Sequence, residues 1–119
     1  MIRRVIAVSA HQIPAREPMR LVVGELVEAG ERSDEWPAFV FVVGSHGSGW
    51  VPARYLSGPS GQVQVQVPYD TTELLTAVGD ALEVWAEDLP SGWLWCRSLD
   101  GREGWVPLES VSSHQELTE

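Results

Sequence analysis

The sequence repeats itself at an interval of 55 residues, and this repeat constrains the fold more than any other feature. The pair Gly24-Glu25 recurs as Gly79-Asp80, and the tetrapeptide Gly49-Trp50-Val51-Pro52 recurs as Gly104-Trp105-Val106-Pro107. Two separate motifs that share one interval indicate a duplicated unit. Between the halves, residues 57–61 read Ser-Gly-Pro-Ser-Gly, a composition typical of a linker.

Short strands dominate both halves of the sequence. Residues 62–67 alternate strictly between polar and apolar side chains, as a strand with one buried face does. Residues 2–8 and 39–43 are rich in β-branched or aromatic side chains. Asp100-Gly101 predicts a two-residue hairpin turn, and residues 44–49 predict a longer turn at the matching place in the first half. We therefore expect small antiparallel barrels, a closed form that removes exposed sheet edges.

The order of these motifs resembles the Src homology 3 (SH3) domain. That family opens with a strand reading Ala-Leu-Tyr-Asp-Tyr and continues through a long arched loop to a Gly-Asp or Gly-Glu turn. It ends with Gly-aromatic-Val-Pro and a short helical turn. Residues 7–11 take the opening place in the first half, and residues 65–69 take it in the second. The resemblance implies an all-β chain of two tandem small five-stranded SH3-like barrels.

The repeat and the resemblance together predict the domain boundaries. We expect one SH3-like barrel over residues 1–56, a linker over 57–61, a second barrel over 62–113 and a C-terminal tail over 114–119.

The resemblance also implies a set of binding residues. In the family, aromatic side chains and a proline form a groove that grips a left-handed polyproline helix, and acidic loop residues hold an arginine or lysine of the ligand. Carried over to this sequence, the implied peptide-binding residues are Trp36, Pro52 and Tyr55 in the first half, and Tyr69, Trp93, Pro107, Glu87 and Asp88 in the second. Where the family usually has tyrosines, this chain has Ser9, His11, Val67 and Ser110.

The remaining large apolar residues have other predicted roles. Val22, Val23 and Val78 precede the repeated glycines, where the family commonly has charged residues, so we expect an interface with the other domain or with a second chain to cover them. Trp50 and Trp105 are expected to cover the barrel wall. Trp85 and Trp95 have no role in the family pattern, and one of them is a candidate interface residue.

Charge restricts the class of partner. The chain has a net charge of −9, which argues against nucleic acid. Residues 1–56 carry six Arg and six Asp or Glu, whereas residues 57–119 carry two Arg and eleven Asp or Glu. The second half therefore favours a protein or peptide partner that contains arginine or lysine. No apolar run reaches the ~18 residues of a membrane span, so no membrane partner is expected.

Nothing in the sequence indicates catalysis. His11, His46 and His114 lie in separate segments without metal-ligand spacing, so neither a metal nor another cofactor is expected. Cys96, the only cysteine, is expected to be buried and inert. Because no intrachain disulfide can form, a cytoplasmic location is favoured. No nucleophile, base and orienting group occur together in a motif, so no enzyme activity is expected.

The sequence thus predicts a non-catalytic adaptor or regulatory subunit that binds a proline-rich or basic protein segment. The alternative is a structural subunit whose barrels self-assemble into a homo-oligomer or a larger complex. Sizing of the protein in solution separates the two hypotheses.

Overall fold

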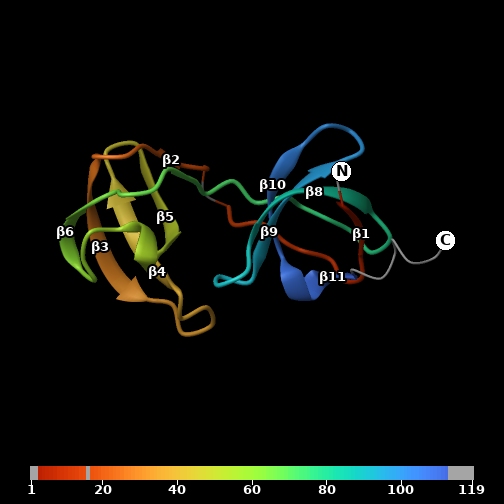
Figure 1. The fold of residues 1–119 in the computed structure, drawn as a ribbon, viewed down its shortest axis with the longest axis horizontal. Helices are drawn as coiled ribbons and strands as arrows, with labels where there is room; N and C mark the ends of the chain where they lie inside the picture. The colour runs from red at the N-terminus through yellow and green to blue at the C-terminus, as the bar shows by residue number, and fades with distance from the viewer. Residues whose placement is uncertain (1–2, 16, 113–119) are drawn as a thin grey trace. The chain divides into compact units, whose positions relative to one another are not determined.

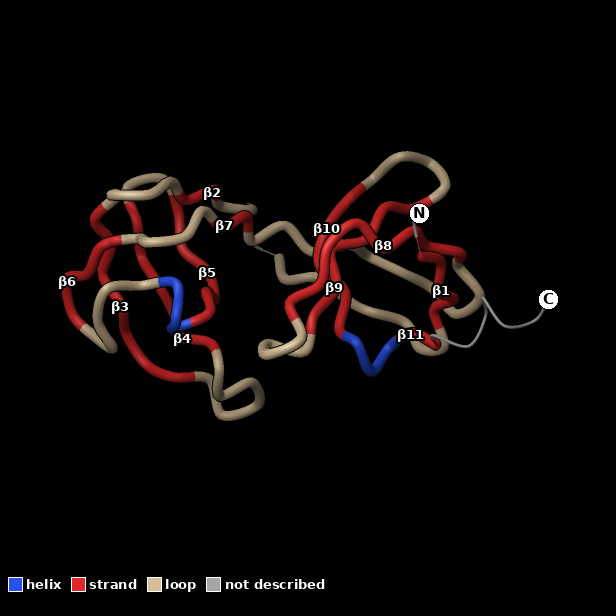
Figure 2. Tube along the Cα trace, viewed as in Figure 1, coloured by secondary structure: helices blue, strands red, loops and turns tan. Residues whose placement is uncertain are grey.

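The computed structural model describes residues 3–15 and 17–112, and over these residues the fold is all-β (Figures 1 and 2). Two 3₁₀ turns interrupt the strands, η1 (Ala53–Tyr55) and η2 (Leu108–Ser110). The strands form three sheets, none of which closes into a barrel within the described part. The predicted C-terminal tail, residues 114–119, lies outside the described residues.

The largest sheet has five strands in the order β10-β9-β8-β1-β11. Its strands are β1 (Arg3–Ala7), β8 (Ala81–Asp88), β9 (Trp93–Ser98), β10 (Glu103–Pro107) and β11 (Val111–Ser112). A four-stranded sheet has the order β5-β4-β3-β6, and a third sheet pairs β2 with β7. The strands of these two sheets are β2 (Arg20–Leu21), β3 (Leu26–Arg32), β4 (Phe39–Gly44), β5 (Gly47–Pro52), β6 (Gly61–Gln64) and β7 (Tyr69–Asp70).

The chain divides into two compact units at positions other than the predicted boundaries. One unit is continuous, Ala15–Thr71, and is called the inserted unit here. The other, called the enclosing unit, combines Met1–Pro14 with Thr72–Glu119. Residues 57–61 therefore do not link two domains. They connect η1 to β6 inside the inserted unit, and β6 begins at Gly61.

The division arises because the two repeats have exchanged their opening segments. The opening segment of the first repeat contains β1, which pairs with β8, and that of the second repeat contains β6 and β7, which pair with β3 and β2. In Figure 1 the red strand β1 lies beside β8, and the green strand β6 lies beside the orange β3. Val5 pairs with Leu82, and at the equivalent position Val63 pairs with Val27. The same backbone hydrogen bonds recur in both units, from Gly79 to Ala7 at 2.8 Å, Gly24 to Val65 at 2.8 Å, Ala7 to Asp80 at 2.9 Å and Val65 to Glu25 at 2.9 Å.

The repeated glycines form equivalent turns, as their spacing predicted. Gly24 has φ of 92° and Gly79 has φ of 95°, a left-handed conformation that glycine adopts without steric cost. In each turn an acidic side chain accepts a backbone hydrogen bond from three residues upstream. Glu25 accepts from the Val22 N–H at 3.1 Å, and Asp80 accepts from the Ala77 N–H at 2.9 Å.

The sequence predicted a longer turn at residues 44–49 than at Asp100-Gly101, and the structure shows the reverse. Gly44 pairs with Gly47, so residues 45–46 alone connect β4 to β5. The Ser98 N–H donates to the Arg102 carbonyl at 2.9 Å, which leaves the three residues 99–101 in the other turn. Gly101 has φ of 92°, the left-handed residue that ends a three-residue hairpin loop. The Asp-Gly pair was correct as a turn signal but not as a measure of loop length.

The cores of the two units match position by position. In the enclosing unit the buried cluster consists of Val5, Leu74, Leu82, Val84, Leu94, Cys96 and Val106. The inserted unit buries the residues Leu21, Val27, Ala29, Val40, Val42, Val51, Val63 and Val65. Alternate residues of each strand face inward, as expected for sheets with one covered face. None of the helices formed by the described residues has the length and apolar character needed to cross a membrane.

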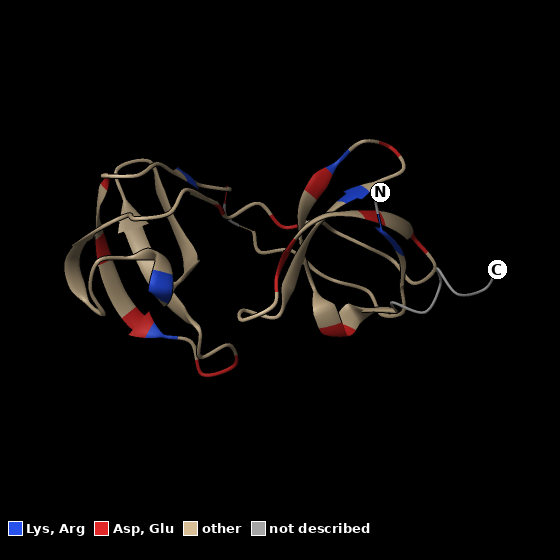
Figure 3. Cartoon of the chain, in the orientation of Figure 1, with Lys and Arg blue, Asp and Glu red and all other residues tan. Residues whose placement is uncertain are grey.

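The exchange also redistributes charge between the two units (Figure 3). It brings Arg3 and Arg4 into the enclosing unit, which then has ten Asp or Glu against four Arg, a net charge of −6. The inserted unit gains Asp70 and has seven Asp or Glu against four Arg, a net charge of −3. The contrast of zero against −9 between the sequence halves is therefore reduced in the folded units.

Candidate functional site

The exchange sorts the predicted binding residues into new groups. Tyr69, which belongs to the second repeat, joins Trp36, Pro52 and Tyr55 of the first repeat in the inserted unit. In the enclosing unit, Trp93, Pro107, Glu87 and Asp88 remain together and gain His11 from the first repeat. Each predicted groove therefore has to be considered with residues from both repeats.

In the inserted unit, two tyrosines that are 14 residues apart in the sequence lie in contact. The rings of Tyr55 and Tyr69 meet edge to face, with centroids 5.6 Å apart and planes at 65°. The guanidinium carbon of Arg54 lies 4.7 Å from the Tyr55 ring centroid. The Gln66 N–H donates to the Tyr55 carbonyl at 2.7 Å, which fastens η1 to the segment leading into β7. We call Arg54, Tyr55 and Tyr69 the tyrosine cluster.

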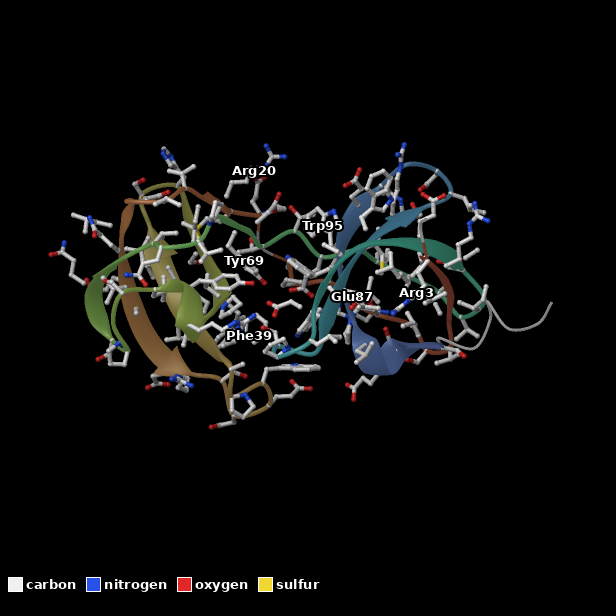
Figure 4. All side chains as sticks on the ribbon, in the orientation of Figure 1. Arg3, Arg20, Phe39, Tyr69, Glu87 and Trp95 are labelled. Carbon is white, nitrogen blue, oxygen red and sulfur yellow. The ribbon has the colours of Figure 1, made fainter. Side chains whose placement is uncertain are left out.

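Phe39 and Pro52 lie on β4 and β5 of the four-stranded sheet, and η1 with Tyr55 directly follows Pro52 (Phe39 and Tyr69 are labelled in Figure 4). Phe39 pairs with Pro52 across β4 and β5, and Trp93 pairs with Pro107 at the equivalent place in the enclosing unit. Phe39 rather than Trp36 is therefore the structural counterpart of Trp93. Sequence analysis missed this residue because it matched tryptophan to tryptophan. Counting back from the repeated Val-Pro does not find it either, because the β4–β5 turn is one residue shorter than the β9–β10 turn and the count gives Ala38.

Trp36 lies in the turn before β4. Its backbone N–H donates to the Ser33 hydroxyl oxygen at 2.9 Å, and its carbonyl accepts a hydrogen bond from the Phe39 N–H at 2.9 Å. Trp36 and Tyr55 are half-buried, whereas Phe39, Pro52 and Tyr69 are buried. The exposed carboxylates of Asp34 and Glu35 directly precede Trp36. Among the residues considered for this groove, the accessible aromatic surface is thus provided by Trp36 and Tyr55.

In the enclosing unit, the positions equivalent to Tyr69 and Tyr55 carry residues that form polar contacts. His11 stands where the inserted unit has Tyr69, and its Nε2 lies 2.9 Å from a carboxylate oxygen of Glu73. The His11 ring meets the buried Trp93 ring edge to face at 5.5 Å. Ser110 stands where the inserted unit has Tyr55, and its buried hydroxyl donates to the Pro107 carbonyl at 2.9 Å. This place offers no accessible pair of tyrosines.

Both predicted acidic ligands of the enclosing unit have partners within the chain. Glu87 forms an ion pair with Arg3 at 2.7 Å, and the two residues are labelled in Figure 4. Asp88 is 6% exposed and accepts a hydrogen bond from the Ser91 hydroxyl at 2.9 Å. Asp88 therefore stabilises the turn between β8 and β9 instead of presenting its carboxylate to a ligand.

The three valines predicted to form an interface are exposed. Val22, Val23 and Val78 have exposed fractions of 63%, 60% and 69%. Each lies in a turn whose geometry is set by the following glycine and acidic residue, so the valine side chains are not required for the turn. Coverage of these valines by a second chain remains a prediction.

Cys96 is fully buried in the core, as expected from the sequence. Burial raises the pKa of its thiol to about 12, although the nearby Arg3 opposes part of this shift. A thiol with this pKa is protonated at neutral pH and is a poor nucleophile. Within residues 3–15 and 17–112, no group of three or more His, Cys, Asp or Glu side chains is placed to hold a metal ion.

Comparisons of this chain with family models, with curated proteins and with solved structures find no match.

Proposed function

We propose that this protein is a non-catalytic protein-interaction module of two divergent SH3-like barrels. It binds an extended protein segment, proline-rich or basic, at the tyrosine cluster and Trp36 of the inserted unit. The observation that carries this proposal is the contact between Tyr55 and Tyr69 at 5.6 Å, which assembles two tyrosines from different repeats beside Pro52.

The turns and strands support the SH3-like part of the proposal. In both units a 3₁₀ turn directly follows the repeated Val-Pro, as η1 does after Pro52 and η2 after Pro107. The repeated Gly24 and Gly79 form matching turns. These features occur in the order that the resemblance to SH3 domains implies.

The chemistry of the inserted unit suits a polyproline ligand. Such a segment is already extended before it binds, so little conformational entropy is lost on docking against aromatic rings. Trp36 and Tyr55 provide half-exposed rings, and Asp34 and Glu35 provide carboxylates for a basic residue of the ligand. We assign the module no catalytic role and no cofactor.

Peptide titration tests the proposal. The probe is a proline-rich peptide with one arginine, and its control is the same peptide with alanine in place of each proline. We expect Tyr55→Ala and Trp36→Ala each to weaken binding of the probe at least about tenfold, as loss of an aromatic anchor does. The exposed His46→Ala at the β4–β5 hairpin tip is the matched control, with unchanged affinity expected.

Circular dichroism of each variant shows whether the fold is retained. Equal binding of the proline and alanine peptides, or unchanged affinity in both aromatic variants, contradicts the proposal.

A second candidate function is self-assembly as a structural subunit. The observation that favours it is the exposure of Val22, Val23 and Val78, since exposed apolar side chains gathered in turns are unusual without a partner. Sizing with light scattering should then give a mass that is a multiple of 13.1 kDa, and Val22→Ser with Val78→Ser should return it to that of one chain.

We also propose a cytoplasmic location, supported by the single cysteine, which excludes an intrachain disulfide. Fractionation of cells tests this location.

A further inference from the structure

The outward face of β8, β9 and β10 carries three tryptophans in one row. Trp95 pairs with Trp105, and Trp85 lies on β8 at the bulge beside Trp95. A row of charged residues runs beside them, with Glu83 paired to Arg97 and Arg97 paired to Glu103. The inward residues of these strands form the core, so all six side chains lie on the outer face. We call these six residues the tryptophan face.

Contacts within the tryptophan face hold its rings in defined orientations. Trp95 and Trp105 meet edge to face with centroids 5.2 Å apart. The Trp95 indole N–H donates to Glu103 at 2.9 Å, and the Trp85 indole N–H donates to Glu83 at 3.3 Å. The Arg97 guanidinium carbon lies 6.0 Å from the Trp85 ring centroid. Glu83 also lies 3.8 Å from Arg4 of β1.

The inserted unit shows that the fold itself does not require Trp85, Arg97 or Glu103, although its Phe41 and Trp50 keep the edge-to-face pairing of Trp95 and Trp105, with centroids 5.1 Å apart. At the positions equivalent to the three tryptophans it has Gly30, Phe41 and Trp50. At the positions equivalent to the charged row it has Glu28, Val43 and Ser48. Trp85 is 51% exposed and contributes little to the core, so its presence calls for another explanation. Exposed tryptophans backed by a rigid sheet are typical of protein-binding surfaces.

Charge indicates the kind of partner. The enclosing unit has a net charge of −6, and the tryptophan face itself carries two carboxylates against the one guanidinium of Arg97. Contact between the tryptophan faces of two copies would bring two enclosing units of net charge −6 together, which opposes self-association through this face. A basic partner is instead attracted. Arg97 already shows how a guanidinium is placed near the Trp85 ring, and arginine is the cation most often found over tryptophan.

We propose that the tryptophan face binds an arginine-containing extended segment of another protein. Its guanidinium groups stack on Trp85 and Trp95, and Glu83 and Glu103 accept their hydrogen bonds. The surface belongs to the enclosing unit and is separate from the tyrosine cluster of the inserted unit, so the protein has one binding surface in each unit.

The full chain is titrated with an extended peptide of alternating arginine and serine residues, and tryptophan fluorescence reports binding. Trp85→Ala should weaken binding at least about tenfold, and Glu83→Gln with Glu103→Gln should also weaken it. Trp50→Ala, at the equivalent place in the inserted unit, is the matched control, and its affinity should be unchanged. Tyr55→Ala should likewise have no effect, which separates this surface from the tyrosine cluster.

A lysine–serine peptide of equal charge should bind more weakly, because ammonium groups do not stack on rings as guanidinium groups do. Equal binding of both peptides with no effect of Trp85→Ala would reveal diffuse charge attraction and overturn the proposal. So would absence of binding, equal losses in Trp85→Ala and Trp50→Ala, or a dimer in sizing that Trp85→Ala converts to a monomer.

Discussion

The inserted and enclosing units share one pattern of strand pairing but present different side chains on their surfaces. Where the inserted unit has Tyr69 and Tyr55, the enclosing unit has His11 and Ser110, both engaged in polar contacts. Where the enclosing unit has Trp85, the inserted unit has Gly30. The strand positions that form the core of the two units are apolar in both. A duplicated framework has thus kept its core while its two copies acquired different candidate binding surfaces.

The comparison depends on which opening segment belongs to which unit. If the segments were not exchanged, Tyr69 would lie with Trp93, and His11 would lie with Phe39. The tyrosine cluster exists only because β7 belongs to the inserted unit. A test of the exchange therefore has a larger consequence for the proposed function than any other test below.

Engineered disulfides test the exchange directly. Arg4 pairs with Glu83, so Arg4→Cys with Glu83→Cys should form a disulfide nearly completely under mild oxidation, since paired residues of antiparallel strands lie within reach of one. Glu28 is the residue equivalent to Glu83, so Arg4→Cys with Glu28→Cys should remain reduced. Mass spectrometry of peptides digested without reductant measures both.

The buried Cys96 does not compete in this experiment at neutral pH, because its thiol has a pKa of about 12. A crosslink between positions 4 and 28, and none between 4 and 83, would mean that each repeat retains its own opening segment.

Two equivalent glycines, Gly104 and Gly49, differ in how closely the surrounding atoms pack against them. A Cβ at Gly104 would lie 2.7 Å from backbone atoms of Glu73 and Leu74, which cannot move without displacing the chain. Gly104→Ala should therefore destabilise the protein by about 1–3 kcal/mol. At Gly49 the nearest atom is a methyl carbon of Thr71 at 3.3 Å, a side chain that can shift. Gly49→Ala should change stability by less than about 1 kcal/mol.

Urea unfolding of the two alanine variants, followed by circular dichroism, provides the measurement. Equal losses of stability in the two variants would show that Gly49 and Gly104 are packed equally tightly.

The smallest expected change in stability comes from replacing Cys96 by its counterpart in the inserted unit. Its counterpart in the inserted unit is the equally buried Val42, so Cys96→Val should change stability by less than about 1.5 kcal/mol. The thiol should not react with a thiol reagent at pH 7–8 in the folded protein, because its pKa is about 12. Rapid labelling under native conditions would show that this strand opens.

The direction of the pH dependence follows from the same pKa. The folded protein raises the pKa of Cys96 above the ordinary 9.0, so its contribution to stability is complete below that pH and is lost as the pH rises above it. The stability of Cys96→Val should fall less over this alkaline range.

Several elements could be predicted from the sequence because their signals are local. The run of residues 39–43 forms most of β4, the first part of the alternation at 62–67 lies in β6, and the repeated glycines form the expected turns. For these elements a few neighbouring side chains determine the backbone conformation or the face that is buried. The expected burial of Cys96, and the naming of Tyr55 and Tyr69 in two separate grooves, came instead from the resemblance to SH3 domains.

Only the tertiary structure decided which strands pair and therefore which residues share a surface. β1 carries Val5 and Ala7 inward, and the second opening segment carries Val63 and Val65 inward, so either segment satisfies the backbone hydrogen bonds and core of either unit. Backbone pairing does not depend on side-chain identity, and a repeated pattern offers two equivalent partners. The sequence by itself determined the strands and turns, and the folded chain determined that Tyr55 meets Tyr69 and that His11 meets Glu73.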